Sequence, residues 1–284
     1  MLAGSIGAFA ATRVGAYPLA PSPTPLRFSE PTPDVFAQVA PRSGIATGVT
    51  FSDSIAKLAA AGVIDPGKYR GYAGALPDWI DRALVTRSDE PIVFSRHTAP
   101  YLLVLLWAVG LANKAAFNAK SPIATVRIPG FASTGGWSLG REESGYVYFN
   151  SVEAVSLTTP QQAAVLEVAT TTYRPCCDNS TFFQDCNHGS AMLGLLQIAA
   201  SQGASTKDLY RIGLAANSYW FSENYAKTAL YFAHFHLVTW RELDPSLVLS
   251  GQLSSASGWA KNIDEPLRRA GLRLPGASDD QQGC

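Results

Sequence analysis

The chain has 284 residues, of which 47% are apolar and 15% are charged. This size and composition are typical of a globular protein with one large or two small domains, which excludes a small scaffold held by disulfides alone. The 22 basic and 22 acidic side chains balance, so we expect no nucleic-acid partner. The 24 glycines and 18 prolines predict long irregular connections.

The two ends of the chain differ in amino-acid composition from the part between them. Residues 1–17 include a short apolar, alanine-rich stretch, which we interpret as a remnant of a signal or anchor segment, with a frayed terminus as the alternative. Residues 18–34 are rich in proline and predict a semi-rigid linker. Residues 276–284 form a polar tail that ends in Cys284. Together these features predict an extracytoplasmic protein, either periplasmic or membrane-anchored.

Residues 35–275 are predicted to form a single, mainly helical, bundle-like domain. Apolar side chains at helical spacing, together with capping residues, indicate helices at 53–62, after Pro77, 98–112, from 159, 189–202, 205–217 and 222–234. The apolar run at 101–112 is shorter than a membrane span needs, so it predicts a buried core helix. Alternating and β-branched residues on either side of a glycine-rich turn predict a small β-hairpin within 123–150.

The segment that carries chemistry is the Cys/His loop at 174–189, between two predicted helices. Three of the four cysteines fall within eleven positions of this loop, and a histidine follows them. Thiols at a helix N-terminus beside an arginine favour the thiolate form, and thiolate with imidazole suits zinc, copper or iron. The predicted metal ligands are Cys176, Cys177, Cys186 and His188.

Other residues of this loop are expected to support the site. Cys177 and Cys186 are the predicted catalytic thiolates, because their separation of nine positions can close a loop. Acidic side chains beside metal ligands commonly orient them. The predicted cofactor-binding residues are Arg174, Asp178, Asp185 and Asn187.

Three other interpretations of the same loop remain open. A structural disulfide could join Cys186 to one of the two adjacent cysteines. Alternatively, His188 and Asp185 only cap the following helix while the cysteines fill small gaps in the core. A thiol redox or nucleophilic site without a metal is the third.

Two short motifs in this loop resemble those of a known family. Pro175-Cys176, followed downstream by Asn187-His188-Gly189 at a helix start, is similar to the haem-thiolate peroxygenases. In that family the Pro-Cys loop supplies the axial thiolate, so the resemblance implies haem as an alternative cofactor. It covers five residues, and the second proline and the Glu-His-Asp segment of the family pattern are absent here.

Two functions of different class follow from these observations. The first is a metal- or cofactor-dependent oxidoreductase that acts on a small molecule and carries copper, iron or zinc. The second is a non-catalytic binding or structural subunit with a membrane-associated partner and a disulfide-locked loop. Gly135 and Gly136 lack the spacing of a phosphate-binding loop, so no nucleotide is expected. His234 and His236 can serve one metal only where a helix has ended.

Overall fold

The computed structural model describes residues 34–125 and 128–274 of the chain. The predicted leader, the polar tail and all of the linker except Asp34 therefore lie outside the described residues.

The described chain is mainly helical, as the sequence predicts. The α-helices are α1 (Val35–Val39), α2 (Ser54–Ala60), α3 (Pro66–Ala73), α4 (Asp78–Ala83), α5 (Ala99–Ala112), α6 (Thr159–Thr171), α7 (Asn187–Ser201), α8 (Thr206–Trp220), α9 (Ser222–His236), α10 (Pro245–Val248), α11 (Gly251–Ser254), α12 (Ala256–Trp259) and α13 (Glu265–Arg269). The tighter turns are η1 (Asn118–Lys120), η2 (Pro122–Thr125), η3 (Ile128–Gly130), η4 (Gly145–Tyr148), η5 (Trp240–Glu242) and the π-helical η6 (Ala260–Asp264). The helices expected in the central part of the chain all form.

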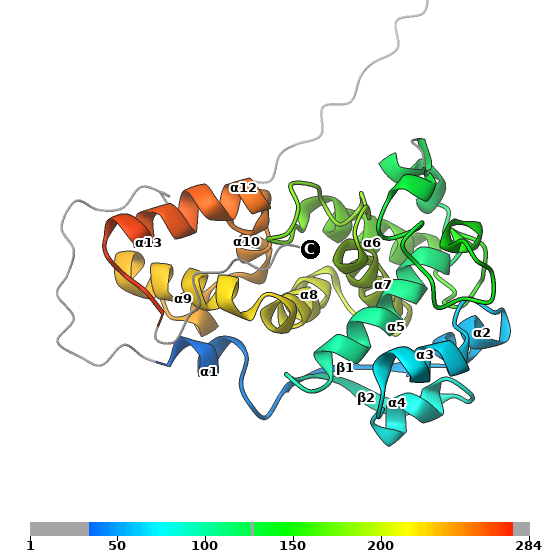
Figure 1. Ribbon diagram of the computed structural model, residues 1–284. Coiled ribbons are helices and arrows are strands. Elements are labelled where there is room, and N and C mark those ends of the chain that lie inside the picture. The colour runs from blue at the N-terminus through cyan, green and yellow to red at the C-terminus, as the bar shows by residue number, and fades with distance from the viewer. Residues whose placement is uncertain (1–33, 126–127, 275–284) are drawn as a thin grey trace, which may run out of the picture.

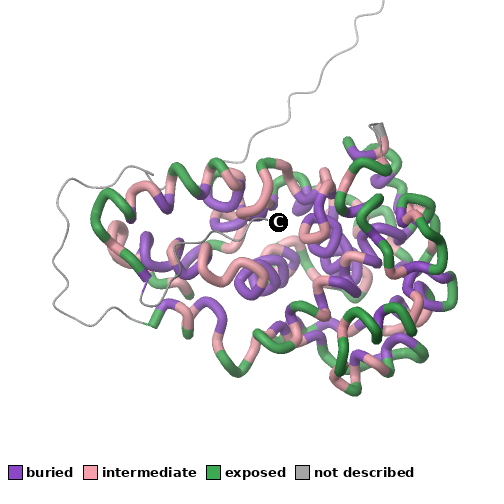
Figure 2. Tube along the Cα trace, in the orientation of Figure 1, coloured by how far each residue is buried: buried purple, intermediate pink, exposed green. Residues whose placement is uncertain are grey.

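Helix α7 is the centre of the core, and the long helices α5, α6 and α8 pack against it (Figures 1 and 2). Every residue from 189 to 200 is buried, as expected for a helix that is apolar on all sides. The strands β1 and β2 and the helices α2–α4 lie at one end of the molecule. At the other end, α9 packs with the C-terminal helices. None of the described helices is long and apolar enough to span a membrane.

The one described sheet pairs β1 (Ile45–Ser52) with β2 (Ser88–Phe94) in antiparallel order. Burial alternates along β1, with Thr47, Val49 and Phe51 facing inward, which is the two-residue period of a half-buried strand. A two-stranded antiparallel sheet is therefore present, but it is formed by other residues than the hairpin predicted within 123–150.

The described residues within 123–150 do not form the predicted β-hairpin, and the reason is physical. The described part of this region forms the turns η2, η3 and η4 instead of strands. Pro122 and Pro129 lack the N–H that a strand ladder needs. The backbone N–H groups of Asn150 and Ser151 bond to the last carbonyls of α5, at Leu111 and Ala112, so they are not available for a hairpin. Residues 126 and 127 lie outside the described residues.

Helices α5 and α7 approach closely because glycines stand where they cross. A Cβ atom at Gly110 would overlap the carbonyl oxygen of Ser190, and one at Gly194 would overlap the carbonyl oxygen of Leu106. Backbone atoms cannot move aside as a flexible side chain can. The position of α7, and of the cysteine at its start, therefore depends on these glycines.

We expect Gly194→Ala to lower the free energy of unfolding by about 2 kcal/mol, because the added methyl group must push α5 and α7 apart. Urea denaturation measures this change. Gly71→Ala is the matched control: this glycine lies inside α3 with nothing within 4 Å of an added Cβ atom. It should leave stability unchanged or raise it by about 0.5–1 kcal/mol. Equal losses in the two variants would contradict the close crossing.

Candidate metal centre

The Cys/His loop connects α6 to α7 and places Cys186 at the first position before α7. Cys186 is the N-cap of this helix, and its Sγ atom accepts a hydrogen bond from the backbone N–H of Gly189 at 3.3 Å. The positive end of the helix dipole therefore faces this sulfur atom. The predicted thiol at a helix N-terminus is present in the structure.

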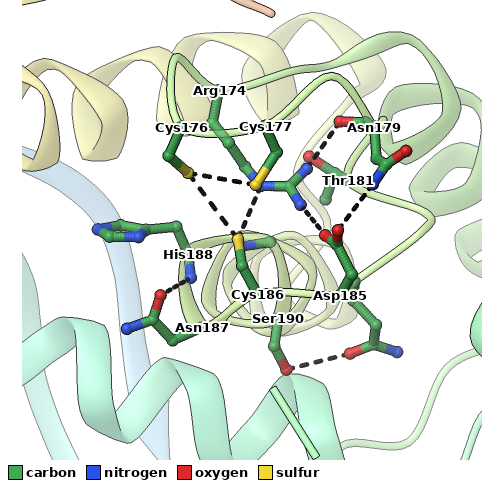
Figure 3. A network of polar contacts seen from close by, with 12 residues as sticks. Arg174, Cys176, Cys177, Asn179, Thr181, Asp185, Cys186, Asn187, His188 and Ser190 are labelled. Atoms are coloured by element: carbon green, nitrogen blue, oxygen red, sulfur yellow. Dashed lines mark hydrogen bonds and ion pairs between the residues drawn. The ribbon is translucent and has the colours of Figure 1, made fainter. Parts of the chain in front are cut away.

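The three described cysteines bring their sulfur atoms together (Figure 3). Cys176 Sγ lies 3.5 Å from Cys177 Sγ and 3.9 Å from Cys186 Sγ. No disulfide bond joins the cysteines within residues 34–125 and 128–274. The loop is therefore not locked by a disulfide in this structure, and other contacts must hold its shape.

Arg174 supplies most of those contacts. Its side chain is only 1% exposed, and its Nε atom donates to Cys186 Sγ at 3.1 Å. Nη1 donates to the carbonyl oxygen of Asn179 at 2.8 Å, and Nη2 to Asp185 Oδ1 at 2.5 Å. Asn179 Nδ2 closes the ring by donating to Asp185 Oδ2 at 2.7 Å. The loop is thus folded around one buried guanidinium group (Figure 3).

The buried guanidinium group of Arg174 is charged at neutral pH, and the sulfur atoms beside it strengthen its hold on the proton. Burial by itself lowers the pKa of Arg174, but Coulombic attraction to Cys186 and Cys177 and the hydrogen bond to Cys186 outweigh burial, so the pKa is raised. A permanent positive charge therefore lies against the sulfur cluster. This charge favours thiolates over thiols.

Two sets of three side chains lie close enough together to be candidate ligands of one metal ion. The atoms of Cys176, Cys186 and His188 all lie within 4.8 Å of one another, and so do those of Cys177, Asp185 and Cys186. Both carboxylate oxygens of Asp185 already accept hydrogen bonds from inside the loop. The set with His188 is therefore the better ligand set, and Cys177, which belongs to the other set, has its sulfur atom 3.5 Å from Cys176 Sγ.

His188 lies on the first turn of α7 and points away from Arg174 (Figure 3). Its ring packs on Phe221, with ring centroids 4.6 Å apart, and against Trp220 at 5.9 Å. These aromatic side chains come from the junction of α8 and α9. Asn187 accepts a hydrogen bond from the backbone N–H of His188 through its Oδ1 atom at 2.9 Å.

Asp178 joins the loop to a distant part of the chain. Its Oδ1 atom accepts hydrogen bonds from the backbone N–H and the hydroxyl of Ser257, at 2.7 and 2.8 Å. The backbone N–H of Ala256 also donates to the carbonyl oxygen of Cys177 at 3.0 Å. The hydrogen bond from the Ser257 backbone is the main reason why the pKa of Asp178 is lowered. The start of α12 therefore fixes the cysteine-bearing side of the loop.

Sequence reasoning missed two residues near the cluster. Asn179, which bridges Arg174 and Asp185, stands out in the sequence only as part of an Asn-x-Ser/Thr triplet. Tyr225 is fully buried on α9, and its pKa is raised by burial and, more weakly, by Cys176. No local pattern marks Tyr225, because it reaches the site through the packing of helices.

The other candidate residues lie apart from the cluster. His234 and His236 are both within helix α9, so their side chains diverge around the helix and do not form a pair on one face. Among the described residues, His188 supplies the single histidine of the two ligand sets. Cys284 lies outside the described residues.

No family model matches the chain, and no curated protein or solved structure matches it. The geometry and chemistry of the cluster therefore carry the functional conclusion.

We expect Arg174→Met to lower the free energy of unfolding by about 3 kcal/mol, because it leaves Asp185 without its buried partner. Urea denaturation at neutral pH measures the loss. Arg70→Met is the matched control, since the Arg70–Asp81 pair is close to half exposed on both sides. Such a pair contributes less than about 1 kcal/mol. Similar losses in both variants would contradict the central place of Arg174 in the loop.

The contact between Asp178 and α12 should weaken in acid. Because the pKa of Asp178 is lowered on folding, its stabilising effect is present above the ordinary value of about 3.9 and is lost as the pH falls through the folded-state pKa. D178N should therefore be less stable than the parent protein at pH 7, and this gap should shrink at pH 3. A gap of equal size at both pH values in urea denaturation would refute the contact.

Proposed function

We propose that the protein binds a single thiophilic transition metal ion through Cys176, Cys177, Cys186 and His188, and uses it in redox chemistry on a small molecule. The observation that carries the proposal is the approach of two sulfur atoms and an imidazole nitrogen to within 4.8 Å of one another at the start of α7. Thiolate and imidazole ligands together select zinc, copper and iron.

The sulfur separations fit one ion. Thiolates that bind a tetrahedral ion at about 2.3 Å lie about 3.8 Å from one another. The separations from Cys176 Sγ to the other two sulfur atoms are 3.5 and 3.9 Å. In an iron–sulfur cluster each iron takes at most two cysteine thiolates, and haem iron takes one axial thiolate. A set of three adjacent sulfur atoms therefore favours a mononuclear ion over either of these cofactors.

The charges of the site support the same proposal. Three thiolates and a divalent ion together carry one excess negative charge, which would be costly in a buried place without a counter-charge. The Arg174 guanidinium lies 3.1 Å from Cys186 Sγ and shares its positive charge between this thiolate and the Asp185 carboxylate, so it offsets the excess in part. Asn179 and Asp185 hold the other two nitrogen atoms of Arg174. The guanidinium group therefore stays beside the Cys186 sulfur atom and does not occupy the position between the sulfur atoms where an ion would bind.

The redox part of the proposal requires copper or iron, because zinc does not change its oxidation state. Zinc at the same ligands would instead polarise a substrate or hold the loop together. The predicted extracytoplasmic location and the small-molecule or membrane-associated partner remain part of the proposal.

Titration of the reduced, metal-free protein with Co²⁺ tests the site, because thiolate ligands produce a strong charge-transfer absorption. One equivalent should saturate the signal. His188→Ala should weaken Co²⁺ binding at least tenfold while the far-ultraviolet circular dichroism stays unchanged, since the buried apolar face of α7 holds the helix. Binding should also weaken below about pH 6, because thiolate and imidazole must lose protons to bind a metal.

The control variants distinguish residues that bind the metal from residues that do not. His236→Ala removes a histidine of α9 and should leave Co²⁺ binding unchanged, as should Cys284→Ser. Cys186→Ser should abolish the charge-transfer band. If the band is unaffected by Cys186→Ser, or if H188A binds as tightly as H236A, the proposed ligand set is wrong.

A further inference from the structure

Cys176 and Cys186 lie close enough to form a disulfide after a small movement. Their sulfur atoms are 3.9 Å apart, whereas a disulfide bond is about 2.05 Å long, so they must approach by about 1.8 Å. Cys176 lies in a turn between Arg174 and Cys177, and an isolated β-bridge closes this turn. The sulfur atoms can approach by rotation of the Cys176 side chain while Cys186 stays at the start of α7.

The two sulfur atoms differ in exposure. Cys176 is half-buried, whereas Cys186 is 7% exposed and accepts hydrogen bonds from Arg174 Nε and the Gly189 N–H. A small oxidant that diffuses from solvent therefore meets Cys176 first. Cys186 lies behind it, with donors that hold it as a nucleophile for a second step.

Cys177 is a poorer partner for either sulfur atom. The Cα atoms of adjacent residues lie only about 3.8 Å apart, less than the ~4.4–6.8 Å that a disulfide usually spans, which disfavours a bond between Cys176 and Cys177 in spite of the 3.5 Å separation of their sulfur atoms. The backbone of Cys177 is also held on both sides, because its N–H donates to Arg174 and its carbonyl oxygen accepts from Ala256. The geometry thus favours Cys176 and Cys186 as the pair.

We propose that a hydroperoxide converts Cys176 and Cys186 to a disulfide, and that this disulfide and the metal ion exclude each other. The bond would take two of the three sulfur ligands and so release the ion. The disulfide itself follows from the sulfur geometry alone, whereas the exclusion of the metal rests on the proposed function.

The chemistry balances with the hydroperoxide as the oxidant. The Cys176 thiolate attacks the terminal oxygen, the O–O bond breaks, and the alkoxide leaves and is protonated to an alcohol. The resulting Cys176 sulfenic acid is attacked by the Cys186 thiolate, and the S–O bond breaks as hydroxide leaves and is protonated to water. The two thiolates lose two electrons, and the peroxide gains them.

The test uses the full chain with Cys284→Ser, so that the fourth thiol cannot exchange. Metal-free protein receives one equivalent of hydrogen peroxide, remaining thiols are alkylated, and peptides are identified by mass spectrometry. We expect a cross-link between Cys176 and Cys186 and an alkylated Cys177. A cross-link that contains Cys177, or oxidation without any cross-link, would overturn the proposal.

Three further variants, C177S, C186S and C176S, assign the steps. C177S should form the same cross-link, whereas C186S should stop at a sulfenic acid on Cys176 that dimedone traps. Circular dichroism checks that all three variants are folded. The assigned order also predicts that Cys186 in the C176S variant forms a sulfenic acid more slowly than Cys176 does in the C186S variant. Equal rates in the two variants would contradict this order.

Zinc serves as the probe for exclusion, because it does not itself consume peroxide. Zinc-loaded protein should release its ion in step with cross-link formation. The cross-linked protein should bind zinc with an affinity at least 100-fold lower than that of the reduced protein. A cross-linked protein that keeps its zinc would refute the exclusion. If the reduced protein binds no zinc at all, the proposed function fails. The disulfide is then tested by the peroxide experiment on metal-free protein alone.

Discussion

The guanidinium group of Arg174 is the interaction on which the loop and its sulfur cluster depend. It is buried, and each of its three nitrogen atoms bonds to a different residue of the loop: Cys186, Asn179 and Asp185. One side chain therefore folds the loop and places a positive charge beside the thiolates. Because an unpaired buried charge is costly, the sulfur cluster and the arginine stabilise each other.

The rest of the fold gives this loop a rigid support on two sides. Helix α7, which begins next to Cys186, lies in the centre of the core and packs closely on α5. On the other side the start of α12 binds Asp178 and the backbone of Cys177. Metal sites built on fixed elements keep their ligands at defined distances. The helical domain thus holds a compact ligand cluster where an irregular loop alone would not.

The sequence predicts what is encoded locally. Helices such as α6 and α8 carry their capping boxes and apolar faces within a few turns, and the candidate ligand residues lie within thirteen positions of one another, from Cys176 to His188. The strands escaped prediction because β1 and β2 are about forty positions apart and pair without a short turn. The contact of Asp178 with Ser257 spans 79 positions, and spacing alone does not show that Cys176 lies beside both other cysteines.

X-ray absorption spectroscopy of the metal-loaded protein tests the central claim most directly, because it counts the atoms around the ion and measures their distances. With zinc bound, three sulfur atoms at about 2.3 Å and one nitrogen atom at about 2.0–2.1 Å are predicted. A first shell of oxygen and nitrogen atoms alone, or a protein that retains no ion after dialysis, would contradict the metal centre.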